Sequence, residues 1–307
     1  MTTLLALPRE LRDEILVLVL TTPTPPYIGP REHTGEQIGA RGPEHVWYPA
    51  YTLASTAALP ILLTCRQLRR ETEELALPEA ADYTMHASLG ARPYREGSHH
   101  YMCQLYPTWT VVPRFANVVR TITVDFHMEH DIPRNVFRGG DGGPATLVWL
   151  FYHTLTHFIR VGPRGIVESA KDHHVCVRTL RIHVHPRHDE QDEQDDFTRR
   201  SRRAMDNRPL SARALAQFLD MQIRVLLYMG YHSAEYGATL YEHIGRLAIY
   251  VGESEMLAEY DLGLSKLDRT DEDNTFGHVE RGKRAAAFAE WKSEAVQLRE
   301  QRGLDTL

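Results

Sequence analysis

Apolar residues near the beginning of the chain recur at helical spacing in two separate stretches. In the first stretch, 4–20, Leu11, Ile15 and Leu18 follow one another at intervals of four and three residues, after a proline at position 8 that suits a first helical turn. The second stretch, 61–77, has a stripe of its own, formed by Ile61, Cys65, Leu68, Thr72 and Leu75. Because short helices with one apolar face are unstable alone, the pattern predicts that the two helices pack on each other or on the rest of the chain.

Apolar and polar residues alternate in three later segments, 119–126, 177–184 and 245–251, which predicts three strands. Helical patterns separate them at 145–160 and 211–229, and a serine stands at a suitable capping position of the second helix. Strands that alternate with helices imply right-handed crossovers and a partly parallel sheet. The strands lie roughly sixty residues apart, so they form at most a distorted relative of a leucine-rich repeat, whose period is about 20–29 residues.

These patterns predict an α+β fold in two parts. The first part, 1–80, is a helical module with a long inserted loop at 21–59, which is rich in proline, glycine and threonine. The second part, 81–307, is a mixed, partly parallel sheet with covering helices. Its further elements are expected as strands at 82–89 and 100–112 and as a C-terminal helix at 280–302. A highly charged segment at 186–209 has few apolar residues, so we expect it to be solvated and mobile.

The two N-terminal stretches contain the most distinctive motifs of the sequence. Residues 7–15 have the sequence Leu-Pro-Arg-Glu-Leu-Arg-Asp-Glu-Ile, and residues 62–71 have the sequence Leu-Leu-Thr-Cys-Arg-Gln-Leu-Arg-Arg-Glu. Together they resemble the opening of fungal F-box-like proteins, whose pattern is approximately LPxELRxxIY followed by LLxTCRQIRxEA. The resemblance covers residues 4–77. The chain differs from a compact F-box in that about forty residues separate the two helices, where the compact form has a short third helix.

The resemblance implies that these helices dock on the Skp-type adaptor of a cullin–RING ubiquitin ligase. The positions that match the family pattern, and that would face the adaptor or support that face, are Leu7, Pro8, Leu11, Ile15, Leu63, Cys65 and Leu68. The chain would then be a substrate-recruiting subunit without catalytic activity, and its second part would bind a protein target. The alternative is a non-catalytic scaffold or regulatory protein whose N-terminal helices serve only as core packing.

Composition narrows the range of partners and compartments. The chain has 307 residues and a formal net charge of −6, so it has no global basic surface and nucleic acid is not a favoured partner. Its three cysteines, Cys65, Cys103 and Cys176, are too widely spaced for a disulfide framework, which favours a reducing compartment, either cytoplasmic or nuclear. The most apolar window, 145–159, contains two histidines and is too short to span a bilayer.

One group of residues has the composition of a metal site. His183 and His185 lie two residues apart on a predicted strand, which places both imidazoles on one face, and His188, Asp189 and Glu190 follow closely. The cluster has no committed fourth ligand and no rigid supporting residues. We therefore expect no tightly bound metal here, and the polar outer face of a strand is the alternative interpretation.

Two other segments carry incomplete motifs. Residues 277–284 match GxxxxGK, but Arg284 stands where a phosphate-binding loop has the serine or threonine that holds magnesium. The third cluster follows the first of the three strands and consists of His127, Glu129, His130 and Asp131, with glycines at 139, 140, 142 and 143. Nothing in it identifies a nucleophile or an oxyanion donor. The sequence thus predicts no catalytic residue and no cofactor.

Overall fold

The computed structural model describes residues 4–23, 35–37, 47–49, 61, 63–75, 81–93, 101–113, 116–128, 146–164, 175–186, 210–269 and 274–304. Its helices are η1 (Leu4–Ala6), α1 (Arg9–Thr21), α3 (Arg66–Leu75), α4 (Thr146–Val161), η4 (Gly162–Arg164), α5 (Ala212–Leu227), α6 (Ala234–His243), η5 (Leu264–Lys266) and α7 (Arg284–Gln301). Its strands are β1 (Gly35–Gln37), β2 (Trp47–Pro49), β3 (Ala81–Pro93), β4 (Tyr101–Val111), β5 (Val118–Met128), β6 (Cys176–Val184), β7 (Ile244–Val251) and β8 (Glu255–Asp261). Most of the predicted loop 21–59 and nearly all of the charged segment 186–209 lie outside the described residues.

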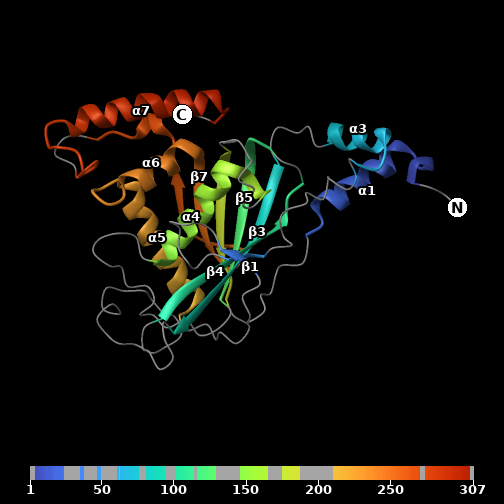
Figure 1. Ribbon diagram of the computed structural model, residues 1–307, viewed down its shortest axis with the longest axis horizontal. Helices are drawn as coiled ribbons and strands as arrows, with labels where there is room; N and C mark the ends of the chain where they lie inside the picture. Colours follow the sequence, from blue (N-terminus) through green and yellow to red (C-terminus); the bar gives the residue numbers. More distant parts are fainter. Residues whose placement is uncertain are drawn as a thin grey trace.

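A six-stranded mixed sheet organises the larger part of the chain and confirms the predicted α+β class. Its order is β4-β3-β5-β6-β7-β8. The four central strands run parallel, and β4 and β8 are antiparallel edges (Figure 1). The strands predicted at 119–126, 177–184 and 245–251 correspond to β5, β6 and β7, whereas β8 and the helix α6 were not predicted. In the ranges that the structure describes, no helix has the length and apolar content needed to cross a membrane.

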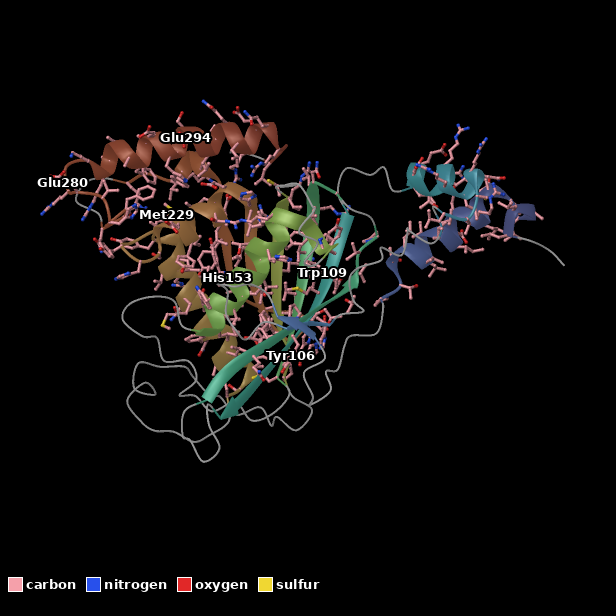
Figure 2. All side chains as sticks on the ribbon, viewed as in Figure 1. Tyr106, Trp109, His153, Met229, Glu280 and Glu294 are labelled. Carbon is pink, nitrogen blue, oxygen red and sulfur yellow. The ribbon has the colours of Figure 1, made fainter. Side chains whose placement is uncertain are left out.

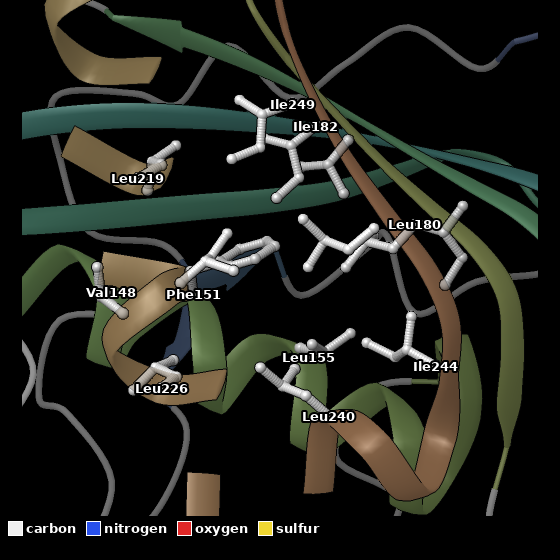
Figure 3. Packing of buried hydrophobic residues seen from close by; sticks show 14 of the residues in the cluster. Val148, Phe151, Leu155, Leu180, Ile182, Leu219, Leu226, Leu240, Ile244 and Ile249 are labelled. Atoms are coloured by element: carbon white, nitrogen blue, oxygen red, sulfur yellow. The ribbon is translucent and has the colours of Figure 1, made fainter. Parts of the chain in front are cut away.

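The alternation of each central strand separates an apolar face from a polar face. Every second residue of β5 from Ile122 onward is buried, and Leu180, Ile182 and Val184 of β6 continue the same layer. Helices α4, α5 and α6 cover this face, and their leucines meet those of β6 and β7 (Figure 3). Full burial of one such side chain stabilises the fold by about 1.5–3 kcal/mol. The hydrophobic core lies between this face of the sheet and the covering helices.

Local signals explain where the covering helices begin. Ser211 accepts a hydrogen bond from the backbone N–H of Ala214 at 3.1 Å, which satisfies one of the free donors at the start of α5. This cap agrees with the predicted serine position. Within α6 the backbone approaches α5 closely at Gly237, where an added Cβ would lie 2.3 Å from the carbonyl oxygen of Leu226. Glycine is therefore required where α6 packs against the end of α5.

Helix α7 lies across one end of the sheet and is fastened there by a buried arginine (Figure 1). Phe288 and Ala295 of α7 are buried, and Leu298 is half-buried. Arg299 is also buried, with 1% of its surface exposed. Its Nη1 donates hydrogen bonds to the backbone carbonyls of Ile244 at 3.0 Å and Leu262 at 3.3 Å, so it joins α7 to the start of β7 and to the residue that follows β8.

The helices α1 and α3 pack on each other and stand to one side of the sheet (Figure 1). The buried residues of α1 are Arg12, Leu16 and Leu20, and those of α3 are Leu68, Glu71 and Thr72. The expectation that Leu11, Ile15 and Leu18 form the packing face of α1 was wrong, because Leu11 is 45% exposed and Leu18 is 64% exposed. The buried face includes a charged residue, which a purely apolar stripe does not identify.

Replacement of Arg299 by methionine should loosen α7. The substitution keeps a long apolar stem but leaves backbone carbonyls buried without their donor, which costs about 1–3 kcal/mol. The thermal unfolding midpoint should fall by several degrees. Arg281→Met, at an exposed position before α7, is the matched control and should leave the midpoint unchanged. Equal midpoints for the two variants would contradict the role assigned to Arg299.

Candidate functional site

A buried ion pair holds the two N-terminal helices together. Arg12 Nε donates to Glu71 Oε2 at 2.9 Å, and Arg12 Nη2 donates to Glu71 Oε1 at 2.6 Å. The same guanidinium donates through Nη1 to the backbone carbonyl of Leu7. The hydrogen bonds from Arg12 lower the pKa of Glu71 to about 2, so the carboxylate stays charged at any ordinary pH. This two-pronged contact fixes how α1 lies on α3 and holds the backbone at the start of α1.

One side of α1 carries an apolar stripe on the outside of the helix pair. Leu11 and Leu18 are exposed on it, the half-buried Ile15 lies between them, and the stripe runs beside the buried one. Leu63, which precedes α3, is 76% exposed. Figure 2 shows the side chains of the pair standing clear of the sheet. We call Leu5, Leu11, Ile15, Leu18 and Leu63 together the exposed leucine surface.

The structure places the seven family-matched residues in three different environments. Pro8, Leu11 and Leu63 are exposed, and Leu7, Ile15 and Cys65 are half-buried. Leu68 is buried within the pair, so it supports the surface from inside and does not form part of it. Cys65 Sγ accepts a hydrogen bond from the backbone N–H of Leu68 at 3.5 Å, so the thiol lies against the first turn of α3.

A second group of residues lies on the polar face of the sheet, toward the carboxyl ends of β5, β6 and β7 and in the middle of β3. The rings of His86 on β3 and His127 on β5 stack with centroids 4.4 Å apart, and those of His127 and His185 stack at 4.5 Å. Next to them, His183 on β6 stacks on Tyr250 of β7 at 4.5 Å. The register aligns His183 with Tyr250 on neighbouring strands, which lie about 4.8 Å apart, whereas His86 is aligned with Asp125 and its ring reaches His127 diagonally. We call His86, His127, His183, His185 and Tyr250 the histidine row.

One carboxylate fixes the charge of the histidine row. His185 Nε2 lies 3.0 Å from Asp125 Oδ1, and this hydrogen bond raises the pKa of His185. Burial on its own would raise the pKa of Asp125, but the hydrogen bond from His185 and the charges of the surrounding histidines together outweigh it, and the pKa lies below its usual range. His185 Nδ1 is 3.8 Å from Glu253 Oε1. The ring of His185 therefore lies between two carboxylates, and both of them favour its protonated form.

The neighbouring ring of His127 is held neutral. Burial, followed by the charges of His86 and His185, lowers the pKa of His127 to about 4. In His183 the hydrogen is on Nδ1, because this nitrogen lies 3.0 Å from the carbonyl oxygen of Gly252, which can only accept a hydrogen bond. The stack thus places His185, whose protonated form is favoured, beside His127, which is neutral at neutral pH.

The histidine row does not have the geometry of a metal site. Parallel stacked rings direct their nitrogen lone pairs in separate planes, so these cannot converge on one ion. Among the described residues, no group of three or more histidine, cysteine, aspartate or glutamate side chains could hold a metal. Of the two histidine clusters considered from sequence, only His183, His185 and His127 fall within the described part of the chain.

Other potentially reactive groups are structural. Cys176 Sγ lies 4.0 Å from His243 Nδ1, but the thiol is completely buried and burial raises its pKa, so it is neither accessible nor activated. The GxxxxGK segment forms turns, and Arg284 donates through Nε to the backbone carbonyl of Val279 at 3.0 Å. A cavity of about 10 Å³ under α4 is lined by apolar side chains and Thr154, whose hydroxyl donates to Leu150 O at 3.0 Å. It is large enough for about one water molecule.

No protein-family model matches the chain, and no curated protein or solved structure is similar to it. The F-box-like resemblance therefore rests on the motifs at 7–15 and 62–71 themselves. It carries an expectation about function that the surfaces described above must support or oppose.

Sequence reasoning missed two groups of residues that the structure brings together. The first group is Arg12 and Glu71, which are charged residues and yet are buried against each other. His86 and Tyr250 were not connected with His127 or His183, because their proximity depends on strand register. The alternation of apolar and polar residues along each strand nevertheless places His86, His127, His183 and Tyr250 on the polar face of the sheet.

Breaking the Arg12–Glu71 pair should open the helix pair without affecting the sheet. Arg12→Met leaves the Glu71 carboxylate buried without its partner, which destabilises the contact strongly. Amide hydrogen exchange in α1 and α3 should become faster at pH 7, and a second substitution, Glu71→Leu, should restore much of the protection. Arg69→Met removes only an exposed pair with Glu73 and should change little. Unchanged exchange in Arg12→Met would disprove the role of this pair.

Asp125→Asn should lower the pKa of His185 toward the usual value of about 6.5. Because the pKa of His185 is raised in the folded chain, the Asp125–His185 contact stabilises the fold fully below the unfolded pKa of about 6.5. This stabilisation is lost as the pH rises through the folded pKa of His185. Titration of the His185 ring by NMR measures the change. Glu253→Gln, which removes a more distant charge, should produce a smaller decrease, and an equal or larger one would assign the effect to the wrong carboxylate.

Proposed function

We propose that the chain is a non-catalytic, substrate-recruiting subunit of a cullin–RING ubiquitin ligase, and that the exposed leucine surface docks on a Skp-type adaptor. The observation that carries this proposal is a row of large apolar side chains facing solvent on a helix pair that does not pack on the core. The motif resemblance supplies the identity of the partner. The sheet-bearing part would bind the protein target.

The distribution of exposed apolar residues supports docking at the helix pair. Single exposed leucines are normal on any protein, but clusters indicate contact surfaces. Among the described residues, six of the ten large apolar side chains that are exposed belong to the helix pair, namely Leu5, Leu11, Val17, Leu18, Val19 and Leu63. Leucines presented at helical spacing are suited to insertion into an apolar groove.

The buried contacts of the pair support its rigidity. Leu16 and Leu20 pack inside, and the Arg12–Glu71 pair fixes the register, so the outer leucines are held in place before any partner binds. A preorganised surface loses less conformational freedom on association. The three widely spaced cysteines agree with a reducing compartment, and we propose a cytoplasmic or nuclear location.

The competing function is a scaffold or regulatory protein whose N-terminal helices are only packing elements. The buried seam of Leu16, Leu20, Leu68 and Thr72 fits this alternative. The exposed leucine surface does not, because packing elements place their large apolar residues inside. The two functions therefore differ in what the outer leucines contribute.

Leu11→Ala combined with Leu63→Ala should abolish binding to a purified Skp-type adaptor and leave folding intact. Interface anchors contribute about 2 kcal/mol or more each, so affinity measured by calorimetry should fall by roughly 700-fold for the two together. Helix content and the unfolding midpoint should be unchanged, because both side chains are exposed. Val225→Ala, at an exposed apolar position on α5, should bind like the parent chain.

A contrasting variant separates the two functions. Leu16→Ala should destabilise the helix pair, since truncation of a buried leucine costs about 2–5 kcal/mol. If the intact chain does not bind the adaptor, or if the exposed double variant binds it equally well, the recruiting function is wrong and the scaffold function is favoured.

A further inference from the structure

The histidine row brings four imidazole rings together on one face of the sheet. It contains His86 from β3, His127 from β5, and His183 and His185 from β6 and its end. In the part of the chain that the structure describes, Asp125 lies within hydrogen-bond distance of His185, and Glu253 of the β7–β8 turn lies 3.8 Å from it. Tyr250 of β7 completes the row. The ring of His127 lies between those of His86 and His185, so a proton on it would meet two other imidazoles.

We propose that the histidine row is a proton-operated switch, which fastens the carboxyl ends of β5 and β6 to each other and to the middle of β3 while His127 is neutral and releases them when His127 takes a proton. The switch is independent of adaptor docking, because none of its residues belongs to the helix pair.

In the closed state the contacts complement one another. The ring of His185 is hydrogen-bonded to Asp125, and the neutral ring of His127 stacks on it with planes 6° apart. His127 also stacks on His86, so it is covered by a ring on each side. The backbone N–H of His185 donates to the carbonyl of Phe126 at 2.9 Å, which continues the contact between β5 and β6 to the end of the strands.

A proton on His127 is incompatible with this arrangement. It would place a positive charge on a ring whose centroid lies 4.5 Å from that of His185 and 4.4 Å from that of His86. Stacking leaves no room for water or a counterion between these rings. Separated rings would regain solvent and accept the proton at an ordinary pKa. The open state therefore binds one more proton than the closed state over the range between the two pKa values, about 6.5 and about 4.

Linkage gives the size of the effect. A single extra proton in the open state shifts the closed-to-open equilibrium by up to tenfold for each pH unit through that range. The shift is confined to the carboxyl ends of the strands, since the core on the other face contains no titratable group of the row. Acid should thus loosen one end of the polar face before the sheet unfolds.

Two measurements on the full chain test this switch between pH 7.5 and 4.5. The first is the NMR titration of the His127 ring, and the second is amide exchange, corrected for its intrinsic pH dependence, at 124–128 compared with 119–122 of the same strand. We expect His127 to remain neutral well below pH 6. Protection at 124–128 should fall by up to tenfold per pH unit below about 6.5, while protection at 119–122 stays constant.

His127→Phe keeps a flat ring in the stack but cannot take a proton, so it should remove this pH dependence. His232→Phe, an exposed substitution in the turn between α5 and α6, should retain it. A His127 ring that titrates at an ordinary pKa in the parent chain would overturn the proposal, and this result can be obtained even if the variant does not fold. Equal loss of protection along the whole of β5, or unchanged pH dependence in His127→Phe, would overturn it as well.

Discussion

The two-residue alternation of four adjacent parallel strands is the constraint on which the larger part of the molecule depends. Because β3, β5, β6 and β7 run in the same direction and in register, each places its apolar side chains in one layer and its polar side chains in the other. The apolar layer needs helices to cover it, which α4, α5 and α6 provide. The polar layer then aligns residues from different strands, and the histidine row is a direct result.

The N-terminal helices follow a different principle, because they have no sheet to cover. Two short helices cannot enclose all of their own leucines, so the pair buries Leu16 and Leu20 and leaves Leu11 and Leu18 in solvent. A buried ion pair provides specificity where the apolar contact is small, since Arg12 and Glu71 fit together in only one register. The consequence is a small unit with an exposed apolar stripe on α1, which is unfavourable unless another molecule covers it.

Features encoded by local spacing could be predicted from the sequence. The strands β5, β6 and β7 and the cap at Ser211 follow from patterns within a few residues. Features encoded by partners distant in sequence could not. Arg12 and Arg299 are buried because acceptors from other elements surround them, and hydropathy alone assigns arginine to the surface. The histidine row required the register of strands that are far apart in the chain.

The adaptor-docking account is tested most directly by a methyl NMR footprint of the full chain with a purified Skp-type adaptor. The account predicts that the methyl signals of Leu11, Leu18 and Leu63 shift or broaden at stoichiometric adaptor, while core signals such as those of Leu180 and Ile182 do not change. A footprint confined to the sheet-bearing part, or no change at any leucine of the helix pair, would contradict it.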